Sequence, residues 1–346
     1  MRTISLFILA LMVLGCAQAP GHNSTLIPPK NAILKSIEGL GRYALGSPVQ
    51  YRNVTVVPVM LTSSDKTQTE DYISLTEAKK NGWVEINEMP NGQEVSRLYV
   101  RNLGKKPLLL LSGELLLGGK QDRVVAKDTV VPPGEEMPVP VFCVEHGRWD
   151  GETSKFEYSE SMAPQSVRKR ATFGSQQDVW DQVSEYNKSA NASGRTTSVR
   201  DGLYGKEIQT QIDDGLRTLT DALAREENVV GFVCLVDGHI QTFELFGNAS
   251  MFSSSRDALL RGFLAEAALH SDAESKPADL DEIGAFIKRS LSGERQQSGL
   301  ARGNGNWSVS SGGVQGAEAT LPAASTPLPN EAPKAETFLH GSYTPK

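Results

Sequence analysis

The strongest constraint on the fold is a long amphipathic helix that leads directly into a tight hairpin. Apolar side chains recur three or four residues apart at positions 204, 208, 212, 216, 219 and 223, which is the spacing of one helix face. Two apolar runs follow at 229–236 and 240–246, and Asp237-Gly238 between them is typical of a two-residue hairpin turn. A long helix beside an antiparallel hairpin favours the α+β class over regular βαβ alternation.

The rest of the chain fits the same class. The first half predicts short helices at 33–40 and 75–80 and strands at 54–60, 83–87, 97–101 and 108–111. The second half predicts amphipathic helices at 175–190, 256–269 and 279–291, and Ser175 with Asp178 resembles a capping box. We therefore expect an α+β fold with antiparallel β-hairpins followed by several amphipathic helices, and with a flexible C-terminal tail.

The N-terminus predicts export and lipidation. Arg2 precedes a mainly apolar run at 4–14, which is too short to span a bilayer but suits a secretory signal peptide. Val13-Leu14-Gly15-Cys16 then resembles a lipobox, so we expect residues 1–15 to be removed and Cys16 to carry lipid such as palmitate. The alternative is an ordinary signal peptide with a chance cysteine. Because Ala17 is not Asp, the expected location is the outer membrane of the cell envelope.

Composition divides the chain into an anchor, a domain and a tail. Residues 16–30 are polar and rich in proline, as in a tether, and residues 31–292 are expected to form a single globular domain. Residues 293–346 are rich in Gly, Ser, Ala and Pro, which predicts a low-complexity tail. Two islands in this tail, 307–309 and 337–340, are candidates for returning edge strands.

Charge and cysteine usage exclude several classes of function. The net charge is −6 and no run of Lys or Arg is longer than three residues, so nucleic acid is not an expected partner. The sequence has no CxxC, HExxH or histidine cluster, so neither a metal site nor a cofactor is expected. Cys143 and Cys234 lie in apolar runs, where buried free thiols are favoured over a disulfide.

The richest polar constellation lies at the open end of a second hairpin. Residues 124–131 and 137–144 read as strands, joined by a turn at 132–136. If these strands pair antiparallel, the polar groups 120–123 and 145–149 meet at their outer ends. The arginines Arg123 and Arg148 can grip phosphate or carboxylate bidentately. Lys120 adds a point charge, and Gln121 adds a donor and an acceptor.

Two carboxylates and an aromatic ring accompany these cations. Trp149 offers a flat face for stacking, and Glu145 or Glu114 could bind ribose hydroxyls or act as a catalytic base. The alternative is structural, with buried ion pairs and a core tryptophan. The structural role is preferred for Glu114 and Trp149, and ligand contact is preferred for Arg123, Glu145 and Arg148. A basic cluster at 167–170 reads as a solvated loop, with extension of an anionic pocket as its alternative.

Two motifs also carry a family resemblance. GELLLGGKQDR, which ends at Arg123, and CVEHGRW, which begins at Cys143, fit the patterns G-E-x3-GGKQ-x-R and C-x-E-x-GRW. From about residue 53 to 291 the chain resembles the family of ADP-ribosylglycohydrolase and rhodanese-phosphatase associated proteins. The resemblance implies an ADP-ribose-like ligand but carries no settled reaction.

Three functions follow as hypotheses. The first is a membrane-anchored lipoprotein whose domain binds an ADP-ribose-like or nucleotide-like anionic small molecule. The second is a hydrolase of a nucleotide-sugar bond that uses Glu145 or Glu114, and the third is a non-catalytic envelope protein that binds another protein. Turnover of a ligand separates the second from the first, so whether the protein is an enzyme stays open at this point.

Overall fold

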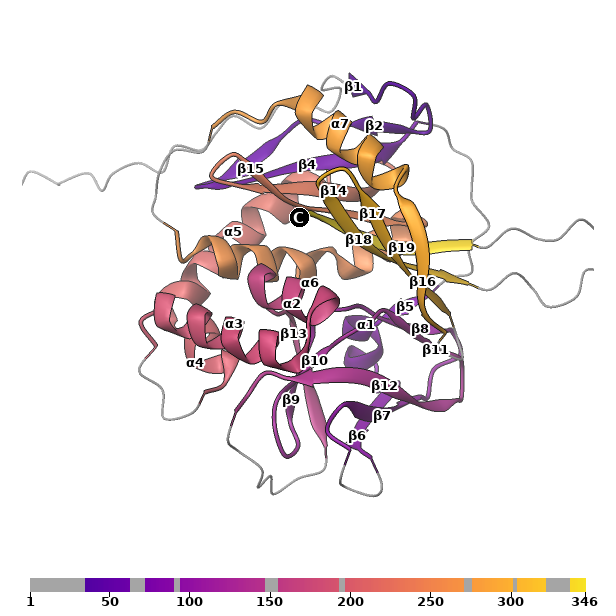
Figure 1. Ribbon diagram of the computed structural model, residues 1–346, viewed down its shortest axis with the longest axis vertical. Coiled ribbons are helices and arrows are strands. Elements are labelled where there is room, and N and C mark those ends of the chain that lie inside the picture. The colour runs from indigo at the N-terminus through magenta and orange to yellow at the C-terminus, as the bar shows by residue number, and fades with distance from the viewer. Residues whose placement is uncertain are drawn as a thin grey trace, which may run out of the picture.

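Two β layers, with helices between and around them, make up the fold (Figure 1). The computed structural model describes residues 35–62, 72–89, 94–146, 155–192, 197–270, 276–300, 304–321 and 337–346. The combination of helices and mainly antiparallel strands confirms the predicted α+β class. The described helices are α1 (Leu75–Lys80), α2 (Gln165–Phe173), α3 (Gln176–Ser189), α4 (Val199–Leu203), α5 (Lys206–Leu223), α6 (Ala249–Ala267) and α7 (Leu280–Leu291).

The larger layer is a ten-stranded antiparallel sheet in the order β1-β2-β4-β14-β15-β19-β18-β17-β16, with β3 paired to β4. Its strands are β1 (Lys35–Ser36), β2 (Tyr43–Leu45), β3 (Val49–Tyr51), β4 (Val54–Leu61), β14 (Val229–Val236), β15 (His239–Phe246), β16 (Glu294–Leu300), β17 (Gly305–Ser311), β18 (Val314–Leu321) and β19 (Thr337–Pro345). The predicted hairpin is β14–β15. Asp237 and Gly238 both have positive φ, as a two-residue hairpin turn requires.

Helices cover both faces of this sheet. Helix α6 contacts β14 and β15 on one side and β13 of the smaller layer on the other, so it lies between the two layers. Buried residues occur on several sides of α6 itself, as expected for an enclosed helix. Helix α7 covers the opposite face of the large sheet, where Ile283, Phe286 and Ile287 pack with Val309 and Tyr343.

The smaller layer is a six-stranded antiparallel sheet that curls toward closure. Its order is β13-β9-β10-β12-β7-β6, and the two end strands meet at an isolated bridge between Asn87 and Lys155. A separate apolar cluster that includes Leu98, Val125 and Phe156 packs around these strands. The strands are β6 (Val84–Glu88), β7 (Arg97–Asn102), β9 (Glu114–Gly118), β10 (Arg123–Val125), β12 (Glu136–Cys143) and β13 (Phe156–Met162).

The second predicted hairpin is confirmed at its open end and at the turn after residue 131, but its predicted first strand is interrupted. Strands β10 and β12 pair antiparallel, with Arg123 opposite Cys143. The chain then bends at residues 126–128 instead of continuing as one strand. The next strand, β11 (Thr129–Val131), pairs with β8 (Leu108–Leu110), which also pairs with β5 (Ile73–Ser74) in a three-stranded sheet. The bend places Asp128 between the two layers.

The two strand candidates of the predicted C-terminal tail, 307–309 and 337–340, lie in β17 and β19, and more of the described tail is strand than predicted. Strands β16–β18 extend the large sheet, and β19 lies inside it, between β15 and β18, and not at an edge. Small residues on β18 are needed for packing there, since a Cβ on Gly316 would lie 2.4 Å from the Tyr343 ring. The Gly-rich and Ala-rich composition therefore reflects close strand packing in this part of the chain. Residues 322–336 lie outside the described residues.

Two local predictions about secondary structure are wrong. Residues 35–36 form a strand followed by a turn, where the sequence predicted a helix at 33–40. Residues 167–170 belong to α2, where the sequence predicted a solvated loop, and Val167 and Arg168 on this helix are buried. The capping box at the start of α3 is confirmed, because Ser175 and Asp178 exchange both of its hydrogen bonds.

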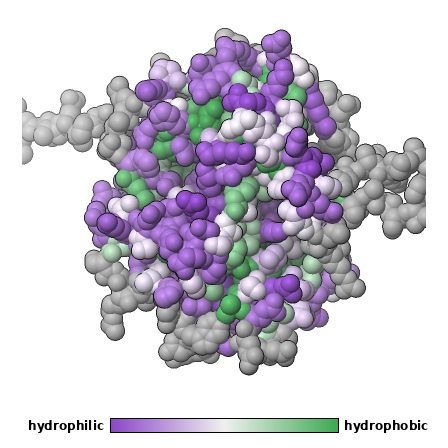
Figure 2. Space-filling model, in the orientation of Figure 1, coloured by the Kyte–Doolittle hydropathy of each residue, from purple (hydrophilic) through white to green (hydrophobic). Residues whose placement is uncertain are grey.

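The face seen in Figure 2 is covered mainly by hydrophilic side chains, and its apolar residues form narrow strips. No helix within the described residues is long and apolar enough to cross a membrane. Cys16, the signal peptide and the tether lie outside the described residues.

Candidate functional site

A buried carboxylate on β15 organises the junction between the two layers. Glu244 is completely buried and accepts hydrogen bonds from Arg168 on α2, at 2.7 and 3.1 Å. It also accepts bonds from the hydroxyls of Thr242 and Ser342, at 2.9 and 2.8 Å. Burial by itself raises the pKa of Glu244. The charge of Arg168 and the hydrogen bonds from His340 and Arg168 outweigh that effect and lower the pKa to about 2.

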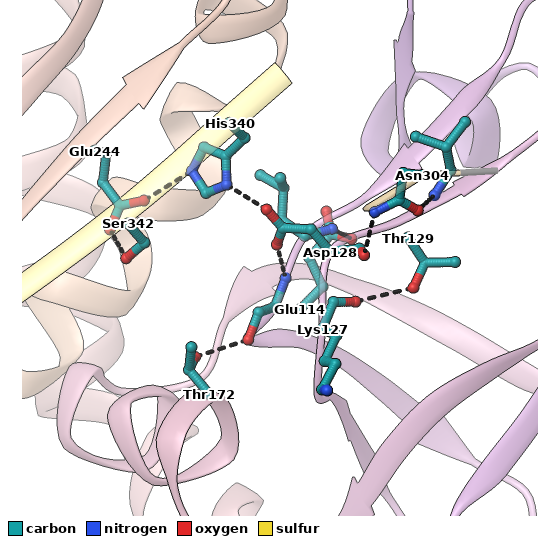
Figure 3. Close-up of polar contacts among 12 residues, drawn as sticks. Glu114, Lys127, Asp128, Thr129, Thr172, Glu244, Asn304, His340 and Ser342 are labelled. Carbon is teal, nitrogen blue, oxygen red and sulfur yellow. Dashed lines mark hydrogen bonds and ion pairs between the residues drawn. The ribbon is translucent and has the colours of Figure 1, made fainter. Parts of the chain in front are cut away.

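His340 on β19 links Glu244 to the bend that carries Asp128 (Figure 3). Its Nδ1 lies 2.6 Å from Asp128 Oδ2, and its Nε2 lies 3.0 Å from Glu244 Oε2. An ionised carboxylate can only accept hydrogen bonds, so both ring nitrogens must donate and the ring is an imidazolium. Burial lowers the pKa of His340, but the charge of Asp128 and the hydrogen bonds from the ring to both carboxylates raise it to about 9.

Arg168 completes the charge balance and fixes a neighbouring loop. Its Nε donates to the carbonyl of Ser112 at 2.8 Å, while its other nitrogens hold Glu244. The side chain lies directly over Gly113, where a Cβ would sit 2.4 Å from Arg168 Cγ and where φ is +99°. The glycine of the sequence motif is therefore needed for this close approach. Two cations and two carboxylates are buried together as a nearly neutral group, which is the form in which buried charges are tolerated.

Asp128 is held from three directions. Its Oδ1 accepts the backbone N–H of Ser112 at 2.7 Å, and its Oδ2 contacts His340. Asn304, directly before β17, donates to the Asp128 carbonyl at 3.1 Å and accepts from the backbone N–H of Val130 at 2.9 Å. The C-terminal strands and the bend at residues 126–128 are thereby fixed against each other, as Figure 3 shows.

Glu114, one of the two candidate catalytic bases, lies behind this network. Its Oε2 accepts the backbone N–H of Leu111 at 3.0 Å, and its Oε1 lies 3.4 Å from the hydroxyl of Tyr158. Burial raises the pKa of Glu114 to about 8. The carboxyl is consequently neutral at neutral pH, which suits the structural role that the sequence preferred for it.

A pocket of about 200 Å³ opens beside Asp128. One wall comes from α2 and the bend at 126–128, and the other comes from strands β16–β18. Lys127 reaches across the pocket edge and donates to the carbonyl of Ser298 at 2.8 Å. The lining residues are Ser112, Ala126, Lys127, Asp128, Thr172, Phe173, Ser298, Asn306, Trp307, Ser308, Gly316, Ala317 and Glu318.

The hairpin-end residues predicted from the sequence form a second, separate cluster. Gln121 donates to the carbonyl of Glu145 at 3.0 Å, and the backbone of Lys120 donates to Glu88 at 2.9 Å. Arg123 is fully buried and bonds the Gln121 carbonyl at 2.7 Å, with Glu88 3.9 Å away. The expected meeting of 120–123 with 145 is therefore confirmed as geometry, whereas ligand contact stays a prediction. Arg148 and Trp149 lie outside the described residues.

Asp122, from the predicted group 120–123, and Arg200, which the sequence did not indicate, close this cluster. Asp122 accepts hydrogen bonds from Nε and Nη2 of Arg200, at 2.7 and 2.8 Å, and from the Ser198 hydroxyl at 3.0 Å. Glu145 is buried and accepts the backbone N–H of Asp122 at 3.2 Å. These contacts attach the start of α4 to the hairpin end.

Arg168, Glu244, Asp128 and His340 were also missed as a group. The signal available in the sequence was a charge inside an apolar strand, as with Glu244 in TFELF, because a buried charge requires partners. Cys143 and Cys234 are both buried free thiols, as the sequence favoured. Among the described residues, no group of His, Cys, Asp and Glu is arranged to hold a metal ion.

The buried Glu114 carboxyl predicts a measurable dependence of stability on pH. Its pKa rises from an ordinary 4.5 to about 8 on folding, so the folded state retains a proton that the unfolded state loses. Its contribution to stability is therefore full below pH 4.5 and is lost as the pH rises through 8, with a slope of up to about 1.4 kcal/mol per pH unit. The pKa of His340 is raised from 6.5 to about 9, so its contribution to stability is also lost as the pH rises.

Urea unfolding at pH 5, 6, 7 and 8 measures this slope. We expect Glu114→Gln to flatten the decline between pH 5 and 8 relative to the wild type, since glutamine does not titrate. Glu136→Gln, at an exposed position, is the matched control and should retain the wild-type slope. Equal slopes for the wild type and Glu114→Gln would show that Glu114 does not retain its proton in the fold.

Comparison with known proteins identifies the family of this chain. The family model of the ARG and Rhodanese-Phosphatase-superfamily-associated Protein domain matches residues 42–327. The match includes Glu114, Asp128, Arg168 and Glu244, and it ends before the strand that carries His340. Searches among curated proteins and among solved structures gave no match. Because the family model covers most of the sequence, the chain belongs to the ARG and Rhodanese-Phosphatase-superfamily-associated Protein family.

Proposed function

We propose that this protein is a lipid-anchored binding protein whose domain takes up a small molecule in the pocket beside Asp128. One observation carries the binding role: the pocket wall is fixed by a buried charge network before any ligand arrives. Asp128, Ser112 and Thr172 reach the pocket, and each is already hydrogen-bonded to a neighbour within the fold. A concave site with a few polar groups held in place is the usual form of a small-molecule site.

The family membership supports the same role in general terms. The family is described by its association with ARG and with the rhodanese-phosphatase superfamily, which suggests phosphorylated or nucleotide-like compounds. An ADP-ribose-like or nucleotide-like anionic ligand is therefore the first class to test. The lipid anchor rests on the sequence resemblance of residues 13–16 to a lipobox, and it places the protein in the cell envelope at the outer membrane.

The two alternatives receive less support from the contacts. Glu114 and Glu145, the candidate catalytic bases, are absent from the pocket lining, so the hydrolase hypothesis loses both of its predicted bases at this site. The surface in Figure 2 presents narrow apolar strips and no broad apolar patch, so that face does not favour a large protein interface. Binding without turnover is the function that the pocket favours.

A ligand screen by thermal shift tests the binding role. The full chain, purified in mild detergent, is mixed with ADP-ribose, NAD, AMP, ribose phosphate, phosphate and simple dicarboxylates. A compound at 100 times its Kd stabilises the folded state by about 2.7 kcal/mol, which is visible as a rise in Tm. We expect a rise with at least one compound and its loss in Ala317→Phe, because the new ring occupies the pocket.

The matched control is Gln315→Phe, two residues along the same strand and outside the pocket lining. This variant should keep the rise in Tm. A rise that survives in Ala317→Phe would contradict the assignment of the pocket and leave the hairpin end around Arg123 as the binding place. If no compound raises the Tm of the wild type, small-molecule binding of this class is rejected.

The lipid anchor has its own test. We expect bacteria that express the full chain to incorporate labelled palmitate into the protein and to retain it in the membrane fraction. Cys16→Ser should abolish both label and membrane retention, because the lipid is joined through the Cys16 thiol. Cys143→Ser is the control and should keep the label, since Cys143 is a buried thiol in β12. Membrane retention of the unlabelled Cys16→Ser chain would contradict lipid anchoring.

A further inference from the structure

We infer that the pocket beside Asp128 recognises an oxyanion, a carboxylate or a phosphate monoester, through Lys127 and Asn306. The inference rests on the proposed binding function and specifies its ligand class. Neither residue belongs to the hairpin-end constellation or to the buried charge network. Both line the same pocket, Lys127 from the bend between β10 and β11 and Asn306 from β17.

Asn306 supplies the first observation. It is 7% exposed, yet among the described residues its side-chain carboxamide has no hydrogen-bond partner. Side chains alternate along a strand, and Asn306 pairs with Ala319, which packs in the core on the α2 side of the sheet. The carboxamide therefore points toward α2 and into the pocket. Its polar atoms are not sealed from solvent, so they are open to a ligand that enters the pocket.

Lys127 supplies the second observation. Its ammonium group donates to the carbonyl of Ser298, and among the described residues it forms no ion pair with a carboxylate. An ammonium has three N–H donors, so it can bond a ligand while it keeps the Ser298 contact. Lys127 is half-buried, which reduces the screening of its charge by water.

The other charges of the lining are already balanced. Asp128 lies against His340, and Glu318 is bound by Arg295 at 2.7 Å and by the Tyr343 hydroxyl at 2.6 Å. Lys127 is thus the charged residue of the described lining that forms no ion pair. A pocket with one uncompensated cation favours a ligand group with one or two negative charges.

Size limits the rest of the ligand. A volume of about 200 Å³ is below the roughly 300–1,000 Å³ typical of pockets that enclose drug-sized molecules. The pocket therefore holds the anionic end of a ligand and a few further atoms, and a complete dinucleotide would extend beyond it. The hydroxyls of Thr172 and Ser308 line the same space, which suits a hydroxylated carbon skeleton next to the anion.

Calorimetric titration of the full chain with three compounds of one skeleton tests this inference. Ribose is neutral, ribonate carries a carboxylate and ribose 5-phosphate carries a phosphate, so the series separates charge from shape and one oxyanion from the other. We expect at least one anion to bind tenfold or more tightly than ribose. Lys127→Met should remove that advantage, and Lys127→Arg should keep it.

Two further variants complete the design. Asn306→Asp keeps the size of the side chain but adds a negative charge, so it should weaken binding of the anion by tenfold or more. Lys105→Met, at an exposed position outside the pocket, should bind as the wild type does. Melting curves of all variants show that they are folded before their titrations are compared.

The outcomes separate this inference from the proposed function. If a compound binds in the pocket but ribose binds as tightly as its anions, or if Lys127→Met retains the anion preference, the oxyanion assignment is overturned while the binding function stands. If neither these compounds nor any compound of the wider screen binds the wild type, both are overturned.

Discussion

The ion pair between Arg168 and Glu244 is the contact on which the junction of the two layers depends. It joins α2 to the central strands of the large sheet, and through His340 and Asp128 it reaches the bend of the smaller layer. Loss of one partner would leave a buried charge without compensation, at a cost of about 3–5 kcal/mol. A neutral, fully hydrogen-bonded group avoids that cost, and Thr242, Ser342 and the backbone of Ser112 supply the remaining bonds.

This arrangement explains why the pocket lies where it does. The bend that carries Asp128 cannot move without breaking contacts to β17 and β19, so the wall of the pocket is preorganised. Preorganisation favours binding because little side-chain freedom is lost when the ligand arrives. In the proposed binding mode, Lys127 and Asn306 on this wall are available to the ligand, and the buried charges hold the wall in place. The function that we propose for this arrangement is binding of a small molecule in an anion-selective pocket.

Local patterns predicted much of the fold, and contacts distant in sequence explain the rest. The α5 periodicity, the α3 capping box and the Asp237-Gly238 turn are local signals, and each appears in the structure. The position of β19 could not be predicted, because its Gly and Ala neighbours suggested flexibility where Tyr343 needs the space. At the site, antiparallel pairing correctly joined Gln121 to Glu145. Asp128 and His340 are in contact although they lie 212 residues apart in the sequence, and a single sequence contains no signal for such a contact.

The charge state of His340 is the most direct test of this account. Nitrogen-15 NMR of the full chain with labelled histidine distinguishes an imidazolium from a neutral ring, and His340→Gln assigns the signal. The account predicts that both ring nitrogens of His340 carry protons at pH 7.5 and that the ring titrates near pH 9. A neutral ring at pH 7.5 would mean that at least one carboxylate lacks the bond described here. The buried charge network would then not be the element that holds the two layers together.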